Sequence, residues 1–174
     1  MNSFDQIAST LKLLVLDVDG VLTDGCIIYD NSGVETKAFN IKDGLGIKLL
    51  QAANIEVAII TGRQSTMVER RAAELGITRL IQGREDKLSA LNELLPELGL
   101  NSEQVAYMGD DLPDLAAIQH VGLGCCPADA VNEVREAANW IATTNGGRGA
   151  VRELAEQLLR SRNQWVPLIE KFYA

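Results

Sequence analysis

Short apolar runs alternate with amphipathic stretches along this chain of 174 residues. The runs have the length of buried strands, and between them apolar residues recur at helical spacing. The predicted strands cover residues 11–16, 57–60, 80–81, 105–108, 121–123 and 140–142. The predicted helices cover residues 46–53, 65–75, 86–98, 112–119, 130–137 and 150–160. Strands that alternate with helices predict a doubly wound, Rossmann-like α/β fold, in which helices cover both faces of a parallel sheet.

Two segments depart from this alternation. Residues 26–39 contain two short apolar stretches around an Asn-Ser-Gly turn, which predicts a β-hairpin that projects just after the first strand. Residues 163–174 follow the last predicted helix and carry Trp165, Phe172 and Tyr173. Aromatic side chains on a tail are expected to dock on the body of the protein or on a neighbour. The chain has no internal repeat or linker, so residues 1–174 are predicted to form a single domain.

Composition and charge exclude several classes of protein. Hydrophobic residues make up 47% of the chain and charged residues 23%, as in ordinary globular domains. The net charge is −8 with no basic cluster, which argues against nucleic-acid binding and means that anionic ligands must be held by a few local cations or a metal. No apolar stretch approaches the roughly 18 residues of a membrane span.

Cysteine usage bears on the compartment. Cys26 and the adjacent Cys125 and Cys126 show no CxxC spacing, and the N-terminus lacks a signal-peptide pattern. A reduced, cytoplasmic location is therefore expected. Cys125 and Cys126 follow an apolar run and are expected to be inert core or turn residues.

The first strand ends in two carboxylates. Alternation along an extended chain places Asp17 and Asp19 on the same side, and Gly20 permits a sharp exit from the strand. One interpretation is a strand end decorated by turn-forming residues. The other is a nucleophile and a general acid/base that flank a metal-bound phosphate.

Three further predicted strands end in polar residues. In an open parallel sheet the ligand site lies outside the carboxyl ends of the strands, where these residues are expected to meet. Taken singly, each has an ordinary explanation as a helix cap or a solvated residue. Taken together, they indicate a phosphoryl-transfer enzyme with a divalent cation among its carboxylates. They comprise a phosphate cradle at Thr61, Gly62 and Arg63, the cation Lys87 at a helix start, and the carboxylates Asp110, Asp111 and Asp114.

These residues occur in the order of the four motifs of the haloacid dehalogenase superfamily of phosphatases, which the chain resembles. The resemblance implies that Asp17 attacks phosphorus to form an aspartyl-phosphate, and that Asp19 protonates the leaving oxygen and then activates water. It implies that Mg²⁺ is held by Asp17, the Asp19 backbone carbonyl and Asp110, with support from Asp111 and Asp114. Thr61 and Lys87 would then hold phosphate oxygens. The gaps between motifs leave no room for a cap domain, so the site is expected to be open on one chain.

Over nearly its whole length the chain further resembles the capless 3-deoxy-D-manno-octulosonate 8-phosphate phosphatases. The resemblance rests on residues 17–25, 37–40, 43–44, 61–63, 82–83, 86–88 and 146–153. It implies a step of lipopolysaccharide precursor synthesis and a homotetramer built around the hairpin, with the hairpin and the aromatic tail contacting neighbours. It also places Asn40, Lys42, Asp43 and Gly44 against the sugar, although an ordinary N-terminal helix turn is an alternative explanation for them.

Substrate choice is expected to depend on arginines. Arg63 and Arg71 lie eight residues apart, about two helical turns, so they can face the same way toward the carboxylate of a sugar acid. Related phosphatases of nine-carbon, sialic-type sugar acids tend to have Glu at the position of Arg63, which favours the eight-carbon substrate and leaves the nine-carbon one as the alternative. Arg148, in a glycine-rich run, could close over a site, or the run could be only a hinge. His120 is interpreted as a helix-end residue and not a ligand.

Two alternatives come from other functional classes. A phosphoryl-accepting receiver module also gathers acidic residues, a Thr and a Lys at strand ends, but its nucleophile lies on the third strand and not the first. A non-catalytic assembly module is the other, and the intact Asp17, Asp19, Lys87 and Asp110 argue against it. Turnover as opposed to stable phosphorylation would separate an enzyme from a receiver.

Overall fold

One parallel sheet organises the molecule, as predicted. The computed structural model describes residues 4–173, and its main sheet has the strand order β5-β4-β1-β6-β7-β8. The strands are β1 (Leu13–Leu16), β4 (Glu56–Ile60), β5 (Arg79–Ile81), β6 (Val105–Met108), β7 (Leu123–Cys126) and β8 (Trp140–Ile141). All four residues of β1 are buried, because β1 pairs with β4 on one side and with β6 on the other. The central strand therefore carries the Asp17 loop into the middle of one edge of the sheet.

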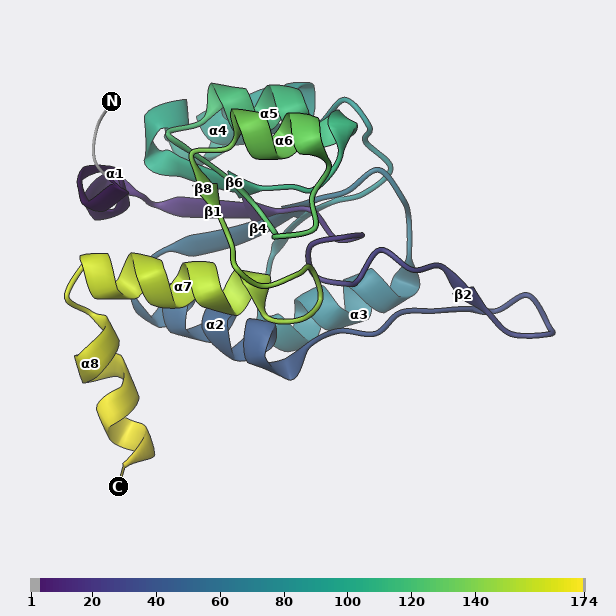
Figure 1. The fold of residues 1–174 in the computed structure, drawn as a ribbon, viewed down its shortest axis with the longest axis horizontal. Helices are drawn as coiled ribbons and strands as arrows, with labels where there is room; N and C mark the ends of the chain where they lie inside the picture. The colour runs from purple at the N-terminus through teal and green to yellow at the C-terminus, as the bar shows by residue number, and fades with distance from the viewer. Residues whose placement is uncertain (1–3, 174) are drawn as a thin grey trace.

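Helices form a layer on each face of this sheet (Figure 1). One layer packs its apolar side chains on β1 and β4 and contains α2 (Ile41–Ala52), α3 (Thr66–Leu75) and α7 (Ala150–Ser161), with α1 (Phe4–Thr10) at its edge. The other contains α4 (Lys87–Leu98), α5 (Leu115–His120) and α6 (Asn132–Ala137). Short 3₁₀ turns lie at η1 (Ser102–Gln104) and η2 (Leu112–Asp114). No helix among residues 4–173 is long and apolar enough to cross a membrane.

Strand β7 begins later than its apolar pattern predicts. The apolar pattern predicts a strand over residues 121–123, whereas the strand spans Leu123–Cys126 and buries both Cys125 and Cys126 as core residues. Gly122 and Gly124 interrupt the pattern because the chain passes close to other backbone there. A Cβ on Gly124 would lie 2.4 Å from the Ile118 carbonyl oxygen, and one on Gly122 equally close to the Glu103 carbonyl oxygen. These glycines are therefore packing residues and not strand breakers.

The predicted hairpin is present and projects from the body (Figure 1). Its strands β2 (Ile28–Tyr29) and β3 (Glu35–Thr36) pair antiparallel, and the Asp30 carboxylate organises the turn by accepting from the backbone N–H of Ser32 and Val34. The hairpin exposes apolar side chains at Ile27, Ile28, Tyr29 and Val34. Such a surface is unfavourable in water, which is consistent with a contact element.

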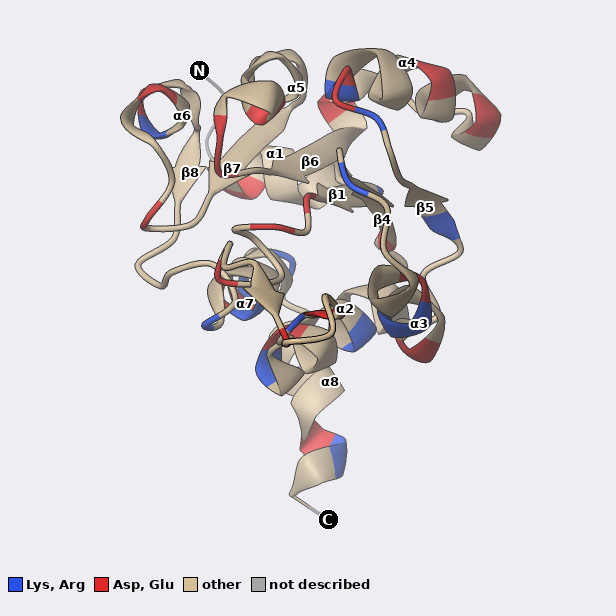
Figure 2. Ribbon diagram, turned by 90° about the vertical axis from the view of Figure 1, so that its right-hand side faces the viewer, with Lys and Arg blue, Asp and Glu red and all other residues tan. Residues whose placement is uncertain are grey.

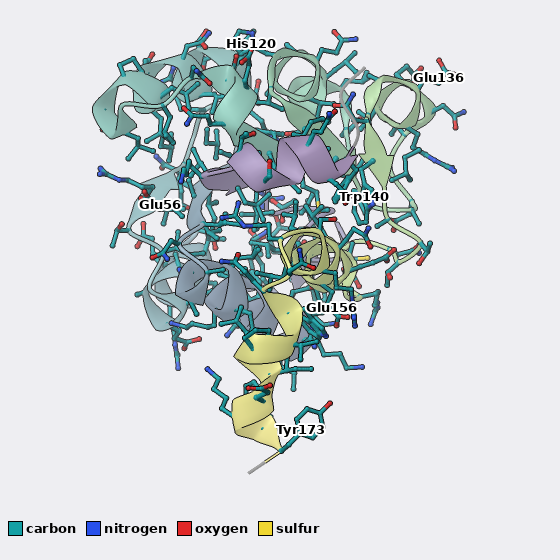
Figure 3. All side chains as sticks on the ribbon, turned by 90° about the vertical axis from the view of Figure 1, so that its left-hand side faces the viewer. Glu56, His120, Glu136, Trp140, Glu156 and Tyr173 are labelled. Atoms are coloured by element: carbon teal, nitrogen blue, oxygen red, sulfur yellow. The ribbon has the colours of Figure 1, made fainter. Side chains whose placement is uncertain are left out.

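The aromatic tail divides into a docked and an undocked part. It forms α8 (Trp165–Ile169) and η3 (Glu170–Phe172). Trp165 is buried, with the guanidinium groups of Arg152 and Arg160 5.4 and 5.0 Å from its ring. Phe172 and Tyr173 are exposed, and Figure 3 shows Tyr173 at the far end of the tail, beyond the helix layers. Docking on the body is confirmed for Trp165 alone, and docking of the other two on a neighbour stays a prediction.

Candidate active site

The loop after β1 aims its carboxylates at the carboxyl edge of the sheet. The Asp17 N–H still donates to the Met108 carbonyl, so Asp17 continues the strand pairing and is itself buried. Gly20 then adopts φ +87°, and the Thr23 hydroxyl ties the loop together by donating to the Val18 carbonyl and accepting from the Gly20 N–H. Positive φ favours glycine. A side chain is also excluded sterically, because a Cβ on Gly20 would lie 2.0 Å from Asp110 Oδ2.

Lys87 connects two buried carboxylates. Its Nζ lies 2.9 Å from Asp17 Oδ2 and donates to Asp114 Oδ1 at 2.7 Å. The Tyr107 hydroxyl also donates to Asp114 Oδ1, at 2.8 Å. A buried ammonium is costly unless it is paired, and its place as the first residue of α4 is otherwise unfavourable for a cation. The two carboxylates supply the compensation, which explains why a lysine is stable in this position.

Asp114 also shapes the loop that presents Asp110. Its Oδ2 accepts from the backbone N–H of Asp110 at 3.2 Å and of Asp111 at 3.4 Å. Gly109 leaves the room for this carboxylate, since a Cβ there would lie 2.2 Å from Asp114 Cγ. Asp111 is exposed and accepts from the Leu112 N–H at the start of η2. Both oxygens of Asp114 are therefore already hydrogen-bonded, while Asp110 is held in place by its backbone.

Three carboxylates lie close together at this edge of the sheet, as near a divalent cation. Asp17, Asp110 and Asp114 each offer an oxygen within 4.8 Å of the others. Asp110 Oδ1 is buried and has no hydrogen-bond partner in the described part of the chain. Burial raises the pKa of both Asp17 and Asp110, and neighbouring carboxylates add to the effect. The pKa of Asp17 rises to about 6, with Asp114 as its main carboxylate neighbour. The pKa of Asp110 rises to about 7, with Asp17 as its main carboxylate neighbour. An unpartnered carboxylate oxygen beside another crowded carboxylate is what a hard cation would satisfy.

These shifts predict how the metal-free protein responds to pH. Both carboxyl groups have a higher pKa in the folded state than the ordinary value of 3.8, so the folded state binds more protons than the unfolded state between about pH 4 and pH 7. The free energy of unfolding should therefore fall, by on the order of a few kcal/mol, as pH rises through this window. Urea unfolding in the presence of a chelator measures it. Asp110→Asn should flatten the dependence, and an unchanged slope in that variant would contradict the assignment.

Strand β4 contributes the second wall of the site. Thr61 follows it, is buried, and pairs through its backbone with Ile81 and Arg84. Figure 2 looks onto this edge of the sheet, where acidic and basic segments of the loops lie at the strand ends. A cleft of about 320 Å³ opens there. It is lined by the predicted residues Asp17, Asp19, Thr61, Gly62, Arg63, Lys87, Asp110, Asp111 and Asp114, together with Gly25, Glu85 and Pro113.

The segment after the hairpin does not line this cleft. Asn40 caps α2 by accepting from the Lys42 N–H at 2.8 Å, and Asp43 is buried and accepts from the Arg152 N–H at the start of α7. Gly44 makes room for Arg71, whose Nη2 would lie 2.4 Å from a Cβ there. In the described chain these residues form the N-terminal turn of α2, with Asp43 and Gly44 buried, and their contact with the sugar stays a prediction.

Arg71 is also separated from Arg63, contrary to the expectation. Helix α3 begins at Thr66, so Arg63 lies in the preceding loop and the helical spacing of eight residues does not apply to the pair. The Arg71 guanidinium donates to Glu74 and lies 6.0 Å from the Phe39 ring. Arg63 instead donates to Glu35 at 2.7 Å. Arg63 therefore lines the cleft, whereas Arg71 of α3 lies against Gly44 of α2.

Three polar residues near the site escaped sequence reasoning. Tyr107 lies in a strand that looks uniformly apolar, and only its hydroxyl distinguishes it. Lys37 pairs with Asp19, and Glu35 pairs with both Lys37 and Arg63. These two come from the return arm of the hairpin, which the sequence placed near the first strand without indicating which side chains turn inward. The available signal was that Glu35 and Lys37 carry charges opposite to those of Arg63 and Asp19 at the strand ends.

Two other candidates lie outside the catalytic cluster. Arg148 pairs with Asp24 at 3.0 Å and is exposed, while the glycines before it pack on the loop after β1, where a Cβ on Gly146 would lie 1.7 Å from the Gly20 carbonyl oxygen. His120 ends α5 and is exposed on the far side of the molecule (Figure 3), as expected of a helix-end residue. A larger hollow of about 970 Å³ at the opposite edge of the sheet has no lysine or arginine among the residues that line it, so it is unsuited to phosphate.

The chain is similar in sequence and fold to known sugar-acid phosphatases. A model of haloacid dehalogenase-like hydrolases matches residues 77–154. The 3-deoxy-D-manno-octulosonate 8-phosphate phosphatase KdsC of Escherichia coli K12 is 48% identical over 157 residues, which cover 90% of this chain and 84% of the relative. The Yersinia pestis enzyme of the same name is 48% identical over 159 residues, covering 91% and 85%.

Solved structures agree. The 3-deoxy-D-manno-octulosonate 8-phosphate phosphatase of Moraxella catarrhalis, in complex with magnesium ion, phosphate ion and KDO, superposes with a TM-score of 0.96 at 48% identity and covers 99% of both chains. The cobalt-bound enzyme of Haemophilus influenzae has a TM-score of 0.89 at 41% identity and covers 92% of this chain and 94% of its own. Neither a receiver module nor a non-catalytic protein is supported by these similarities.

Proposed function

Since the chain belongs to the haloacid dehalogenase-like hydrolases, and within them to the 3-deoxy-D-manno-octulosonate 8-phosphate phosphatases, we propose that it hydrolyses 3-deoxy-D-manno-octulosonate 8-phosphate to the free sugar acid and phosphate. The whole of residues 1–174 would act as one phosphatase domain. The observation that carries the proposal is the buried Asp17–Lys87 pair beside the unpartnered Asp110 oxygen, in an open cleft at the strand ends. A nucleophile, a phosphate-binding cation and a metal-ligand set thus meet in one place.

The reaction proceeds in two steps on this chain's residues. In the first, an Asp17 carboxylate oxygen attacks phosphorus, the bond from phosphorus to the sugar oxygen breaks, and Asp19 gives its proton to that oxygen. In the second, Asp19 takes a proton from water, whose oxygen attacks phosphorus and releases phosphate from Asp17. Asp17 must be ionised to attack, and its ion pair with Lys87 favours that form against the effect of burial.

Mg²⁺ would be held by Asp17, Asp110 and the Asp19 backbone carbonyl. It supplies electrostatic stabilisation of the phosphoryl group and of the charge that develops on it. Asp114, whose oxygens are occupied by Lys87, Tyr107 and two backbone N–H groups, supports this set without binding directly, and Asp111 assists from the rim. The Thr61 hydroxyl, the Gly62 N–H and Lys87 hold phosphate oxygens, and Lys87 offsets the repulsion between Asp17 and the incoming anion.

Arg63 carries substrate choice within the single-chain cleft. Its side chain is 38% exposed and lines the cleft, and the bond from Nη2 to Glu35 orients the guanidinium. A guanidinium has five N–H groups, so it can meet a sugar carboxylate while it keeps this bond. Asn40, Lys42, Asp43, Gly44 and Arg71 do not line this cleft, and we assign them no direct contact with the substrate in one chain. A nine-carbon sugar acid phosphate is the alternative substrate.

Phosphate release from a panel of sugar phosphates tests the proposal. We expect the eight-carbon acid sugar phosphate to be hydrolysed at least about tenfold faster, in kcat/KM, than the nine-carbon acid and the neutral hexose phosphates. Activity should require Mg²⁺ and disappear with a chelator. Equal rates across the panel would be compatible with phosphatase activity but would contradict the assignment of 3-deoxy-D-manno-octulosonate 8-phosphate as the substrate. Stable phosphorylation without turnover would reject the enzyme.

We also propose a cytoplasmic homotetramer assembled through the hairpin. The exposed apolar side chains of β2 and the turn support assembly, and three free cysteines in the described chain support a reducing compartment. Light scattering at micromolar concentration measures the assembly: a mass of four chains is expected, and a monomer would contradict it.

A further inference from the structure

Four charged side chains alternate in sign around the outer half of the cleft. Lys37 on the return arm of the hairpin pairs with Asp19, and its Nζ lies 3.2 Å from Glu35 Oε1. Glu35 Oε2 in turn lies 2.7 Å from Arg63 Nη2, and Arg63 Nε lies 4.0 Å from Asp19 Oδ2. Each cation thus faces both carboxylates. The arrangement joins the hairpin to the ends of β1 and β4.

Lys37 is the most enclosed member of this group. Its side chain is 2% exposed, compared with 26% for Asp19 and 38% for Arg63. An ammonium removed from water in this way needs close counter-charges. Asp19 and Glu35 are the carboxylates that the structure places within ion-pair distance of it, among the residues described. The position is therefore built for a cation whose charge is directed at Asp19.

Among the described residues, Lys37 is the nearest cation to the Asp19 side chain. The Asp19 side chain accepts a hydrogen bond from Lys37, and Arg63 stands farther away, at the limit of an ion pair. Asp17, by comparison, is buried and fixed by Lys87. Each of the two aspartates thus has a lysine of its own, one supplied by α4 and the other by the hairpin.

We propose that Lys37 is a positioning residue that binds Oδ1 of Asp19 and so holds Oδ2, the oxygen that carries the proton, where it meets the leaving oxygen of the substrate. This inference rests on the proposed function, in which Asp19 transfers the proton. Proton transfer requires the two oxygens within hydrogen-bond reach, and small displacements of a catalytic group lower rates steeply. The hairpin therefore contributes to the chemistry through Lys37, in addition to any role in assembly.

Dependence on the leaving group separates this role from a structural one. A sugar alcohol is a poor leaving group and needs the proton of Asp19, whereas p-nitrophenolate departs readily without one. Lys37→Met keeps the length of the side chain and removes its charge. It should slow the first chemical step with the sugar phosphate by about 30-fold and with p-nitrophenyl phosphate by less than about 3-fold. Rapid-quench measurement of the released sugar acid and of the p-nitrophenol burst reports that step for each substrate.

Two further variants control the experiment. Lys48→Met removes an exposed lysine of α2 in the same layer and should leave both rates unchanged. Lys37→Arg retains a cation and should restore a substantial part of the sugar-phosphate rate. Thermal melting establishes that each variant is folded, and if Lys37→Met is not, the Lys37→Arg comparison between the two substrates still applies.

Asp19→Asn distinguishes failure of the inference from failure of the proposed function. If Asp19→Asn slows the sugar phosphate selectively and Lys37→Met slows both substrates equally, Lys37 does not act through Asp19 and the inference is overturned. If Asp19→Asn shows no selectivity itself, the acid role in the proposed function is wrong. Matching selectivity in both variants supports the inference.

Discussion

Asp17→Asn is expected to reduce steady-state phosphate release by about 10⁴-fold or more while leaving the fold intact. An amide has the shape of the carboxylate but cannot attack phosphorus. Asp17 is buried and its pKa is raised to about 6, chiefly by burial and by the nearby Asp114. The carboxylate is therefore held at a cost in stability, and the amide should leave the protein as stable as the wild type or more so. Colorimetric phosphate release and urea unfolding measure the two effects.

An exposed aspartate provides the matched control. Asp5→Asn makes the same chemical change in the first turn of α1, far from the strand ends, and should leave turnover unchanged. Steady hydrolysis by Asp17→Asn above about 1% of the wild-type rate would remove Asp17 from the mechanism.

Lys87→Met is expected to have the largest effect on stability. The substitution leaves Asp17 and Asp114 buried without their ammonium, and breaking a buried ion pair in this way costs about 3–5 kcal/mol. Activity should fall by about 10³-fold, because phosphate and nucleophile then repel each other. Urea unfolding and phosphate release report the two losses, with Lys48→Met as the folded control.

The loss of stability should also grow with pH. Carboxyl groups whose pKa is raised in the folded state favour folding when protonated, so their contribution is lost as pH rises through the folded-state pKa. Without Lys87 these pKa values rise further. The difference in free energy of unfolding between variant and wild type should thus be larger near about pH 8 than near about pH 5. A constant difference would show that Lys87 does not stabilise the ionised carboxylates.

Much of this site follows from where buried strands end. The apolar runs of β1, β4 and β6 identify the strands, and parallel pairing then places Asp17, Thr61 and Asp110 at one edge. Lys87 joins them because α4 begins at the same edge. This inference needs only the order of the elements, so local sequence was sufficient.

The remaining residues depend on how loops fold back. The predicted helical pairing of Arg71 with Arg63 does not hold because the helix starts three residues after Arg63, a boundary that apolar spacing does not define. Lys37 and Glu35 lie in the hairpin, where no periodic pattern indicates which side chain points inward. Their inward direction is set by the charges of Asp19 and Arg63, which belong to other elements. Contacts of this kind are visible only once the fold has brought the partners together.

The central claim is that phosphate passes through Asp17. Rapid acid quenching of the wild-type protein during hydrolysis of 3-deoxy-D-manno-octulosonate 8-phosphate with Mg²⁺, followed by digestion and mass spectrometry, tests it directly. We predict a phosphorylated peptide that contains residues 13–20 in the wild type, with the phosphate on Asp17, and none in Asp17→Asn. Turnover with no phosphate on that peptide, or phosphate on a different residue, would contradict the account.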